Sequence, residues 1–233
     1  MNVLRRATER GHAEHGGWLN SYHTFSFADY YDPEHMGFGA LRVINDDRIA
    51  ASRGFGAHPH RDMEIITYPL AGSLRHQDSM GHGSTIRPGI VQRMSAGRGV
   101  VHSEMNPSPD TEAHILQIWI EPNVRGITPE YEEKSFDEVY VPNALVPILS
   151  PDGRASTMRI HQDALMYAGR FDGELQVVHT LQPGRKAWLH VARGDIRVNG
   201  QDLHAGDALA VSGEAELRLE RADDAEVLLF DLA

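Results

Sequence analysis

Two short segments of this 233-residue chain carry histidine and glutamate residues at a spacing that favours metal binding. The first contains His58 and His60, and the second contains His102 and Glu104. On a β-strand, side chains two residues apart project from the same face, so each pair could act as a two-pronged chelate. Two such strands lying side by side would bring the four side chains to one metal ion.

The donor atoms indicate the kind of metal. Three imidazoles and one carboxylate suit a first-row transition metal in an octahedral centre with open positions, and open positions indicate chemistry rather than a structural role. The chain has no cysteine, which argues against a closed structural zinc site and excludes disulfides. We expect one divalent metal, with Fe preferred and Mn, Ni, Co, Cu and Zn as alternatives.

Composition limits the partners. The formal net charge is -11, from 33 acidic and 22 basic residues, which argues against nucleic acid or an anionic membrane as an electrostatic partner and favours a small-molecule ligand. The amino terminus has no apolar signal-peptide core, and no run approaches the roughly 18 apolar residues of a membrane helix. We therefore expect a cytoplasmic protein, and a monomer.

Short apolar runs separated by Gly, Pro and Asp predict an all-β protein of the barrel or jelly-roll type. Turns are expected at residues 71–73, 87–89 and 96–99. The strands expected in the first half are Ala40–Ile44, Met63–Ala71, Gly89–Met94, Val100–Glu104 and His114–Glu121.

A second β series follows a proline-rich stretch that reads as a linker. The predicted boundaries are an amino-terminal metal-binding domain at 1–125, a linker at 126–150 and a carboxy-terminal domain without metal ligands at 151–233. Tight hairpins are expected at 193–195 and 199–200. The expected strands are Met158–His161, Gln176–Leu181, Ala187–Val191, Asp195–Val198, Ala208–Val211, Ala215–Leu219 and Glu226–Phe230.

Longer motifs resemble the pirin family. The segments from His58 to Gly72 and from Pro88 to Glu104 resemble the two cupin motifs in the form that pirins use, and residues 11–38 resemble bacterial pirin-like proteins with quercetinase activity. The resemblance implies a bicupin, two antiparallel β-barrels packed face to face, with one metal in the amino-terminal barrel. It implies ligands at the positions of His58, His60, His102 and Glu104.

Glu64 is a second candidate carboxylate, because many cupins take their acidic ligand from the first motif. If the strand runs unbroken from His58, parity places Glu64 on the same face as the histidines. The pirin pattern favours Glu104 as the ligand, and leaves Glu64 as a group behind the ligands or a core acid paired elsewhere.

The resemblance implies a metal-dependent dioxygenase that opens the heterocyclic ring of flavonols such as quercetin. The metal would lower the pKa of the flavonol hydroxyl, and Glu104, as ligand or displaced base, would accept its proton. Two alternatives stay open: a metal-loaded regulatory protein acting through protein partners, as in eukaryotic pirin, and an oxygenase for another phenol or enol.

Further candidates carry weaker signals. An aromatic-lined mouth would suit a flat polyphenol, although core packing is the commoner role for such side chains. We interpret His23 and His35 as surface or capping residues and the two His-Gln-Asp triplets, residues 76–78 and 161–163, as hydrogen-bonding groups in loops. The candidate wall residues are Phe38, Phe55, Met63 and Met94.

Overall fold

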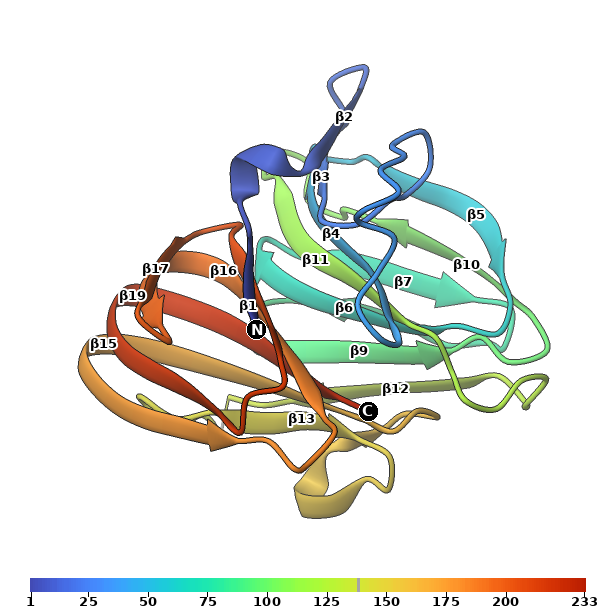
Figure 1. Ribbon diagram of the computed structural model, residues 1–233. Helices are drawn as coiled ribbons and strands as arrows, with labels where there is room; N and C mark the ends of the chain where they lie inside the picture. Colours follow the sequence, from blue (N-terminus) through green and yellow to red (C-terminus); the bar gives the residue numbers. More distant parts are fainter. Residues whose placement is uncertain (138) are drawn as a thin grey trace. The chain divides into compact units, whose positions relative to one another are not determined.

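The computed structural model describes residues 1–137 and 139–233 (Figure 1). Within these residues the chain forms β-strands almost throughout, with two short 3₁₀ helices, η1 (Ala7–Glu9) and η2 (Arg154–Ser156). The predicted all-β class is therefore confirmed. Residue 138, which falls inside the predicted linker, lies outside the described residues.

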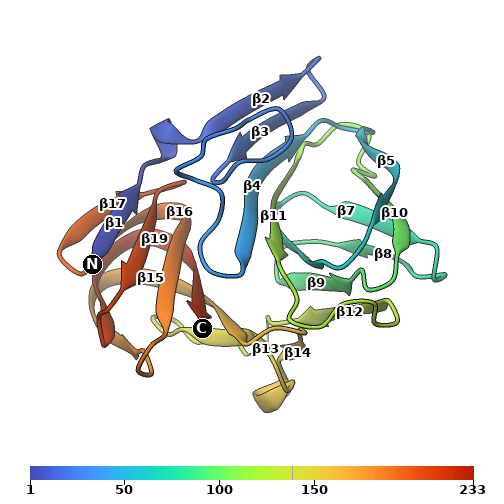
Figure 2. The ribbon, with the colours of Figure 1, turned by 45° about the vertical axis from the view of Figure 1, so that its right-hand side comes forward.

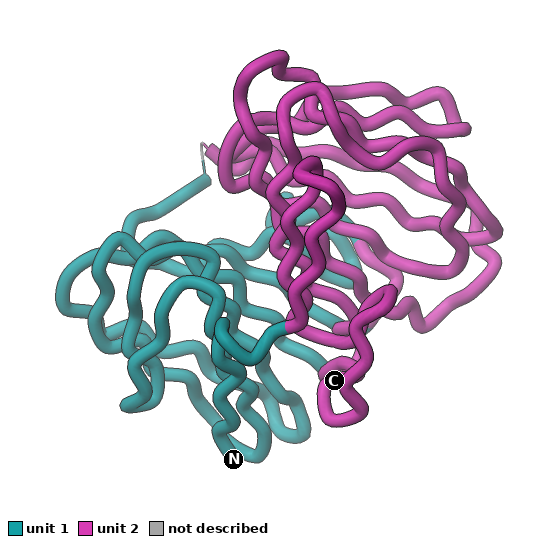
Figure 3. The backbone as a smooth tube through the Cα atoms, turned by 90° about the horizontal axis from the view of Figure 1, so that it is seen from above, with its two compact units in different colours: residues 1–10, 138–159, 163–233 teal, residues 11–137, 160–162 magenta. Residues whose placement is uncertain are grey.

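The chain divides into two compact units (Figure 3). The N-terminal unit comprises residues 11–137 and 160–162, and the C-terminal unit comprises residues 1–10, 139–159 and 163–233. Each unit has its own sheets and its own buried core.

Two antiparallel sheets build the N-terminal unit (Figure 2). One has the strand order β12-β9-β6-β11-β4-β3-β2, and the other has the order β5-β10-β7-β8. Hydrogen bonds donated by Thr67 of β6 and Gln117 of β11 to Glu104 of β10 join the two sheets across the interior. The strands are β2 (Gly11–His15), β3 (Leu19–His23), β4 (Leu41–Ile49), β5 (Gly54–His60), β6 (Glu64–Ala71), β7 (Leu74–Asp78), β8 (Gly83–Ile86), β9 (Ile90–Ser95), β10 (Val100–Met105), β11 (Ala113–Ile120) and β12 (Glu130–Ser135).

Apolar composition and alternation explain why these segments form strands. β6 and β11 are buried along nearly their whole length, as expected for the middle of a covered sheet. β10 alternates, with Val100, His102 and Glu104 buried and the residues between them more exposed. The predicted strands in this half lie within one or two residues of the observed ones, except that β4 continues to Ile49.

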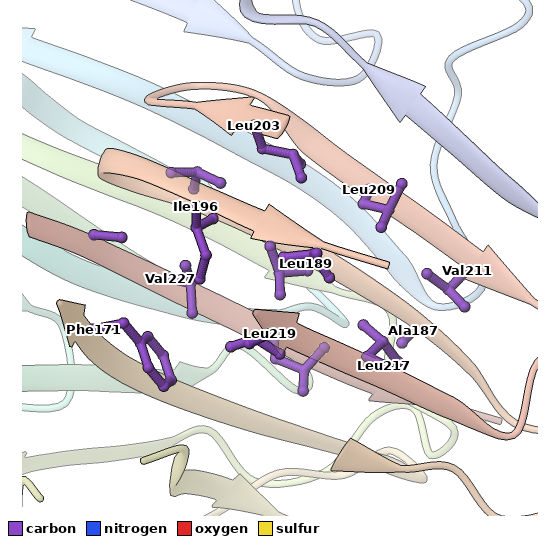
Figure 4. Close-up of a cluster of buried hydrophobic side chains, with 14 of the residues drawn as sticks. Phe171, Ala187, Leu189, Ile196, Leu203, Leu209, Val211, Leu217, Leu219 and Val227 are labelled. Carbon is purple, nitrogen blue, oxygen red and sulfur yellow. The ribbon is translucent and has the colours of Figure 1, made fainter. Parts of the chain in front are cut away.

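The C-terminal unit contains one eight-stranded sheet, with β17 paired to β16 outside the order β1-β18-β16-β19-β15-β13-β14. Its core is aliphatic, and Leu189, Leu209 and Val227 are fully buried in it (Figure 4). The strands are β1 (Asn2–Arg5), β13 (Val146–Ser150), β14 (Met158–Arg159), β15 (Ala164–Thr180), β16 (Lys186–Val198), β17 (Gln201–His204), β18 (Ala208–Ser212) and β19 (Glu216–Leu232).

One predicted hairpin in this unit is correct and the other is wrong. Asn199 and Gly200 have φ of 48° and 73° and join β16 to β17, as the Asn-Gly signal predicts. Gly194 instead lies inside β16, at a register shift. A Cβ there would lie 2.2 Å from the carbonyl oxygen of Asp224, so this glycine permits a bulge rather than a turn.

Two segments differ from the predicted domain boundaries. β1 pairs with β18, so the first residues belong to the C-terminal unit. The 126–150 stretch is not an irregular linker, because it contains β12, which pairs with β9, and β13, which pairs with β15. β12 is an edge strand, and Pro129 stands just before it, where a missing N–H does not interrupt a ladder.

No helix in the described part of the chain is long and apolar enough to cross a membrane.

Candidate metal centre

A β-bulge in β5 determines which of its side chains face the interior of the N-terminal unit. β5 pairs with β10, with His58 opposite His102 and Phe55 opposite Glu104. Two residues separate these positions on β5, and one residue separates them on β10. Because opposed residues share a face, the extra residue brings Phe55, His58 and His60 to the same side of the sheet.

Gly54 allows β5 to lie this close to β10. A Cβ at this position would lie 2.2 Å from the carbonyl oxygen of Glu104 and 2.6 Å from Cα of Met105. Any side chain would push the strands apart at the start of the bulge, so the position requires glycine.

The imidazoles of His58, His60 and His102 converge. The ring centroids of His58 and His102 lie 4.5 Å apart, and those of the other two pairs 4.8 Å apart. One nitrogen of each ring lies within 4.8 Å of the other two, which is close enough for one ion to be shared after small side-chain adjustments.

Two of these rings have a nitrogen available for a metal. Nδ1 of His58 donates to the carbonyl oxygen of Gly56 at 2.7 Å, which leaves Nε2 with a lone pair. Nε2 of His102 is buried and has no hydrogen-bond partner among the described residues. Buried polar atoms are nearly always partnered, so this nitrogen is available to bind a metal ion.

The electrostatics favour neutral imidazole. Burial, with added repulsion from His58, lowers the pKa of His60 to about 4. Burial, followed by repulsion from the neighbouring histidines, lowers the pKa of His102 to about 3. Both rings are therefore neutral at pH 7, the state that binds metals.

Glu104 lies next to His102 but outside the group of three histidine nitrogens. Its side chain is buried and accepts hydrogen bonds from Thr67 Oγ1 at 3.1 Å and from Gln117 Nε2 at 2.7 Å. A carboxylate oxygen lies within 4.8 Å of nitrogens of His76 and His102, which form a second potential metal group with it. Burial, with added repulsion from Asp47, raises the pKa of Glu104 to about 7.

The structure separates Glu64 from the histidines. β5 ends at His60, and a turn with Asp62 at φ 48° precedes β6, which belongs to the other sheet. Glu64 is buried and accepts a 2.8 Å hydrogen bond from Ser95 Oγ. The parity argument for Glu64 fails because the strand does not run unbroken, and the residue is a core acid with its own partner.

His76 lies close to the candidate metal-binding histidines, a position that its sequence context did not indicate. The interpretation of residues 76–78 as a loop is wrong, because His76 lies on β7, fully buried and opposite Glu104. Nε2 of His76 lies 3.1 Å from Asp78 Oδ2, and its Nδ1 lies 3.4 Å from Nδ1 of His102. Its alternation with Asp78 on a strand was the signal that could have found it.

A cavity of about 290 Å³ is lined by His58 and His60 of the three-histidine group. Trp119 and Phe27 form one aromatic wall, with ring centroids 5.4 Å apart in an edge-to-face arrangement, and Trp119 also lies 5.1 Å from the ring of His60. The lining residues are His15, Leu19, Ser21, His23, Phe27, Ala28, Asn45, Asp47, Phe55, His58, His60, Glu104, Gln117 and Trp119.

The predicted wall residues have different positions. Phe55 lines this cavity, whereas Met63 lines a neighbouring one. Met94 is fully buried in the core, and Phe38 forms an isolated bridge with Leu41. Met94 therefore packs in the core, which is the commoner position of large apolar residues.

The predictions for the remaining histidines have different outcomes. His23 is buried on β3 and lines the cavity, so the surface or capping role is wrong for it. His35 pairs with Asp32 at 2.8 Å and does not line the cavity. His161 follows β14 and pairs with Glu130 at 3.3 Å, outside both potential metal groups.

Polar side chains project from the seven-stranded sheet into the same cavity. His23, Asn45 and Gln117 are paired neighbours across β3, β4 and β11, so they form a row on one face. Asn45 Oδ1 is buried and unpartnered within the described residues. Burial, with added repulsion from Asp46, raises the pKa of Asp47 to about 7, which gives the cavity a second carboxyl that is partly protonated near pH 7.

These residues fit a divalent transition metal. The site offers neutral imidazoles, a buried nitrogen without a partner and a nearby carboxyl, and it borders a cavity that can admit a ligand. Both potential metal groups lie in the N-terminal unit, and the described residues of the C-terminal unit contain no such group.

Comparisons with known proteins agree with this arrangement. A family model described as Pirin matches residues 4–120, and one described as Quercetinase C-terminal cupin domain matches residues 147–232. A quercetin 2,3-dioxygenase of Escherichia coli is 50% identical over 232 residues, covering 100% of this chain and 99% of that protein. A pirin-like protein of Caulobacter vibrioides is 41% identical, covering 96% of each chain.

A solved structure is also similar. The crystal structure of the bacterial pirin YhhW of Escherichia coli in complex with nickel(II) superposes with a TM-score of 0.94 at 48% identity, covering 100% of this chain and 99% of that one. The fold is therefore that of a two-domain cupin. The chain belongs to the pirin family.

Proposed function

We propose that this protein is a metal-dependent dioxygenase that opens the heterocyclic ring of flavonols such as quercetin with O₂. The observation that carries the proposal is the cluster of three histidines, two of which, His58 and His60, line an aromatic-walled cavity. Its volume of about 290 Å³ is near the lower end of the roughly 300–1,000 Å³ typical of small-molecule sites. The name of the Escherichia coli relative supports the flavonol as substrate.

The proposed ligands of one divalent transition metal are His58, His60, His102 and Glu104. The lone pairs of His58 and His102 support the first part of this set, and the proximity of Glu104 to His102 supports the carboxylate. The nickel complex of the relative YhhW supports a metal of this class. Fe, Mn, Co, Cu and Zn accept the same donors, since geometry and supply decide among them.

The cavity walls would hold the planar substrate. Trp119 and Phe27 offer apolar ring surfaces, and the unpartnered Oδ1 of Asn45 offers an acceptor for a phenolic hydroxyl. A ligand that fills the space also excludes water from it, which strengthens the electrostatic interactions inside.

Glu104 would accept the proton of the flavonol hydroxyl. When bound, the metal supplies Lewis-acid activation of the flavonol hydroxyl. In the metal-free protein burial raises the pKa of Glu104 to about 7, and the hydrogen bonds from Thr67 and Gln117 hold the carboxyl near His102, where it would accept that proton.

We further propose that the N-terminal unit performs the reaction and that the C-terminal unit is a cupin domain without metal. The absence of a potential metal group among the described residues of the C-terminal unit supports this division.

The test is aerobic incubation of quercetin with protein reconstituted with each divalent metal in turn. We expect loss of the flavonol absorbance, consumption of O₂ and release of carbon monoxide, and we expect His102→Ala to abolish all three. His161→Ala serves as the matched control and should retain them. If every metal-loaded form leaves quercetin unchanged beyond the rate of free metal, the flavonol proposal fails and a binding role becomes the better explanation.

A further inference from the structure

A chain of hydrogen-bonding side chains leads away from Nδ1 of His102. β7 pairs with β10, which places Asp78 opposite His102 and His76 opposite Glu104. The side chains of His76 and Asp78 are both 0% exposed. The chain runs from Asp78 Oδ2 to His76 Nε2 at 3.1 Å, and from His76 Nδ1 to His102 Nδ1 at 3.4 Å.

The outer end of the chain is set by Asp78. Its Oδ1 accepts the backbone N–H groups of Met80 at 2.9 Å and His82 at 3.0 Å, so the carboxylate acts as an acceptor on that side. Its Oδ2 faces His76, and an ionised carboxylate can only accept, so the proton of the neutral His76 ring lies on Nε2. Nδ1 of His76 therefore carries a lone pair.

The position of the hydrogen on the His76 ring determines which nitrogen of His102 carries a hydrogen. A lone pair on His76 Nδ1 can pair with His102 Nδ1 only if the latter carries a hydrogen. Gln92 Nε2, a second donor, also lies 3.4 Å from His76 Nδ1, which agrees with an acceptor there. His102 Nε2 is then the lone-pair nitrogen, and it is the buried atom that lacks a partner among the described residues.

We propose that Asp78 and His76 are positioning residues that fix the ring orientation and tautomer of His102, so that Nε2 faces the metal. This inference rests on the proposed metal site. His58 is held in a similar way, but by a backbone group: its Nδ1 donates a hydrogen bond to the carbonyl oxygen of Gly56. Groups behind metal ligands commonly act in this way, and losing one reduces metal affinity about 10- to 100-fold.

The competing explanation is that His76 is itself a ligand, with His102 and Glu104. In the structure both nitrogens of His76 already face partners, whereas Nε2 of His102 has none among the described residues. A metal at that position would have to displace Asp78 or separate His76 from His102.

The decisive variant is Asp78→Asn. The new amide keeps an oxygen for the N–H groups of Met80 and His82, but it places a donor toward His76 Nε2. His76 would then carry its hydrogen on Nδ1, and His102 would have to move its own hydrogen to Nε2. We expect Ni²⁺ affinity, measured by competition with a chromophoric chelator, to fall about 10- to 100-fold.

His82→Gln is the matched control, because His82 Nδ1 contacts the same carboxylate at 3.1 Å but is 44% exposed and outside the chain. We expect its Ni²⁺ affinity to change less than about threefold, since exposed contacts of this kind are weak. Equal Ni²⁺ affinity in the wild type and a folded Asp78→Asn variant would overturn the positioning role.

Tautomer measurement makes the proposal independent of any variant. Long-range ¹H–¹⁵N correlation spectra of the metal-free wild type should assign the His102 hydrogen to Nδ1, and the opposite tautomer would overturn the proposal. Addition of Zn²⁺ should shift His102 Nε2 and leave the His76 nitrogens unbound, whereas coordination by His76 would favour the competing site. Retention of Ni²⁺ by His102→Ala would instead refute the proposed metal site itself.

Discussion

Glu104→Gln should stabilise the metal-free protein at alkaline pH, although it removes a proposed metal ligand. Burial raises the pKa of the Glu104 carboxyl from 4.5 to about 7. The difference is roughly 2.5 units, and at about 1.4 kcal/mol per unit the ionised carboxylate costs the folded chain about 3 kcal/mol. Glutamine carries no charge and avoids this cost.

The sign of the pH dependence follows from the raised pKa. Below pH 4.5 the folded and unfolded chains both hold the proton, so the contribution of Glu104 to stability is fully present. Between pH 4.5 and about 7 the unfolded chain loses the proton first, and stability falls as the pH rises. The gain from Glu104→Gln should therefore be near zero at pH 4.5 and reach about 3 kcal/mol above pH 7.

Glutamine also fits the hydrogen-bond network. Its amide oxygen can accept from Gln117 Nε2, and its NH₂ group can donate to Thr67 Oγ1, while Thr67 donates to Gln117 Oε1 as it does at 3.0 Å in the structure. Each hydrogen bond that Glu104 makes to Thr67 and Gln117 thus has a counterpart in the variant, so the charge is the main difference that the experiment measures.

The assay is urea unfolding with a metal chelator at pH 5 and pH 8. Trp18 and Trp119 lie in the N-terminal unit and Trp188 in the C-terminal unit, so both proteins carry Trp188→Phe and their fluorescence reports on the N-terminal unit. Glu121→Gln, at an exposed side chain, is the control and should change neither value. Adding Ni²⁺ should make the wild type more stable than Glu104→Gln, because the wild type binds Ni²⁺ more tightly. Identical pH profiles for the wild type and Glu104→Gln would refute the reasoning.

Three further predictions concern other parts of the molecule. His58→Ala and His60→Ala should lower metal content measured by mass spectrometry without altering the β circular dichroism spectrum, whereas His161→Ala should do neither; equal metal retention in all three would contradict the ligand assignment. Trp119→Phe should weaken quercetin binding about 2- to 10-fold in an equilibrium titration. Leu229→Ala, at a fully buried core position, should cost about 2–5 kcal/mol in urea unfolding yet leave one metal per chain.

The predictable parts of the molecule depend on local spacing. The i,i+2 histidine pairs, the Asn199-Gly200 turn and most strand positions follow from periods of two and from turn chemistry, which act within a few residues. The convergence of His58 and His60 with His102 depends on pairing between segments about forty residues apart, and the shared ligand types rather than local spacing suggested that pairing. Whether they bind a metal stays a prediction.

Features that depend on distant pairing could not be predicted. β1 pairs with β18, which lies about two hundred residues further along the chain, and no period in the sequence selects that partner. His76 reaches His102 only because β7 and β10 adopt a particular register. Asn45 and Asp47 line the cavity because one face of β4 borders it. The alternation of side chains along the strand does not reveal which face that is.

Glu104 couples the two sheets of the N-terminal unit. It comes from the strand that carries His102, but its carboxyl is held by Thr67 and Gln117 on the opposite sheet, which also supplies Trp119 and Asn45 to the cavity wall. If the carboxylate turns toward a metal, Gln117 Nε2 loses its acceptor and becomes a donor for a substrate oxygen. Metal and substrate should therefore strengthen each other's binding, and by thermodynamic linkage to the same degree.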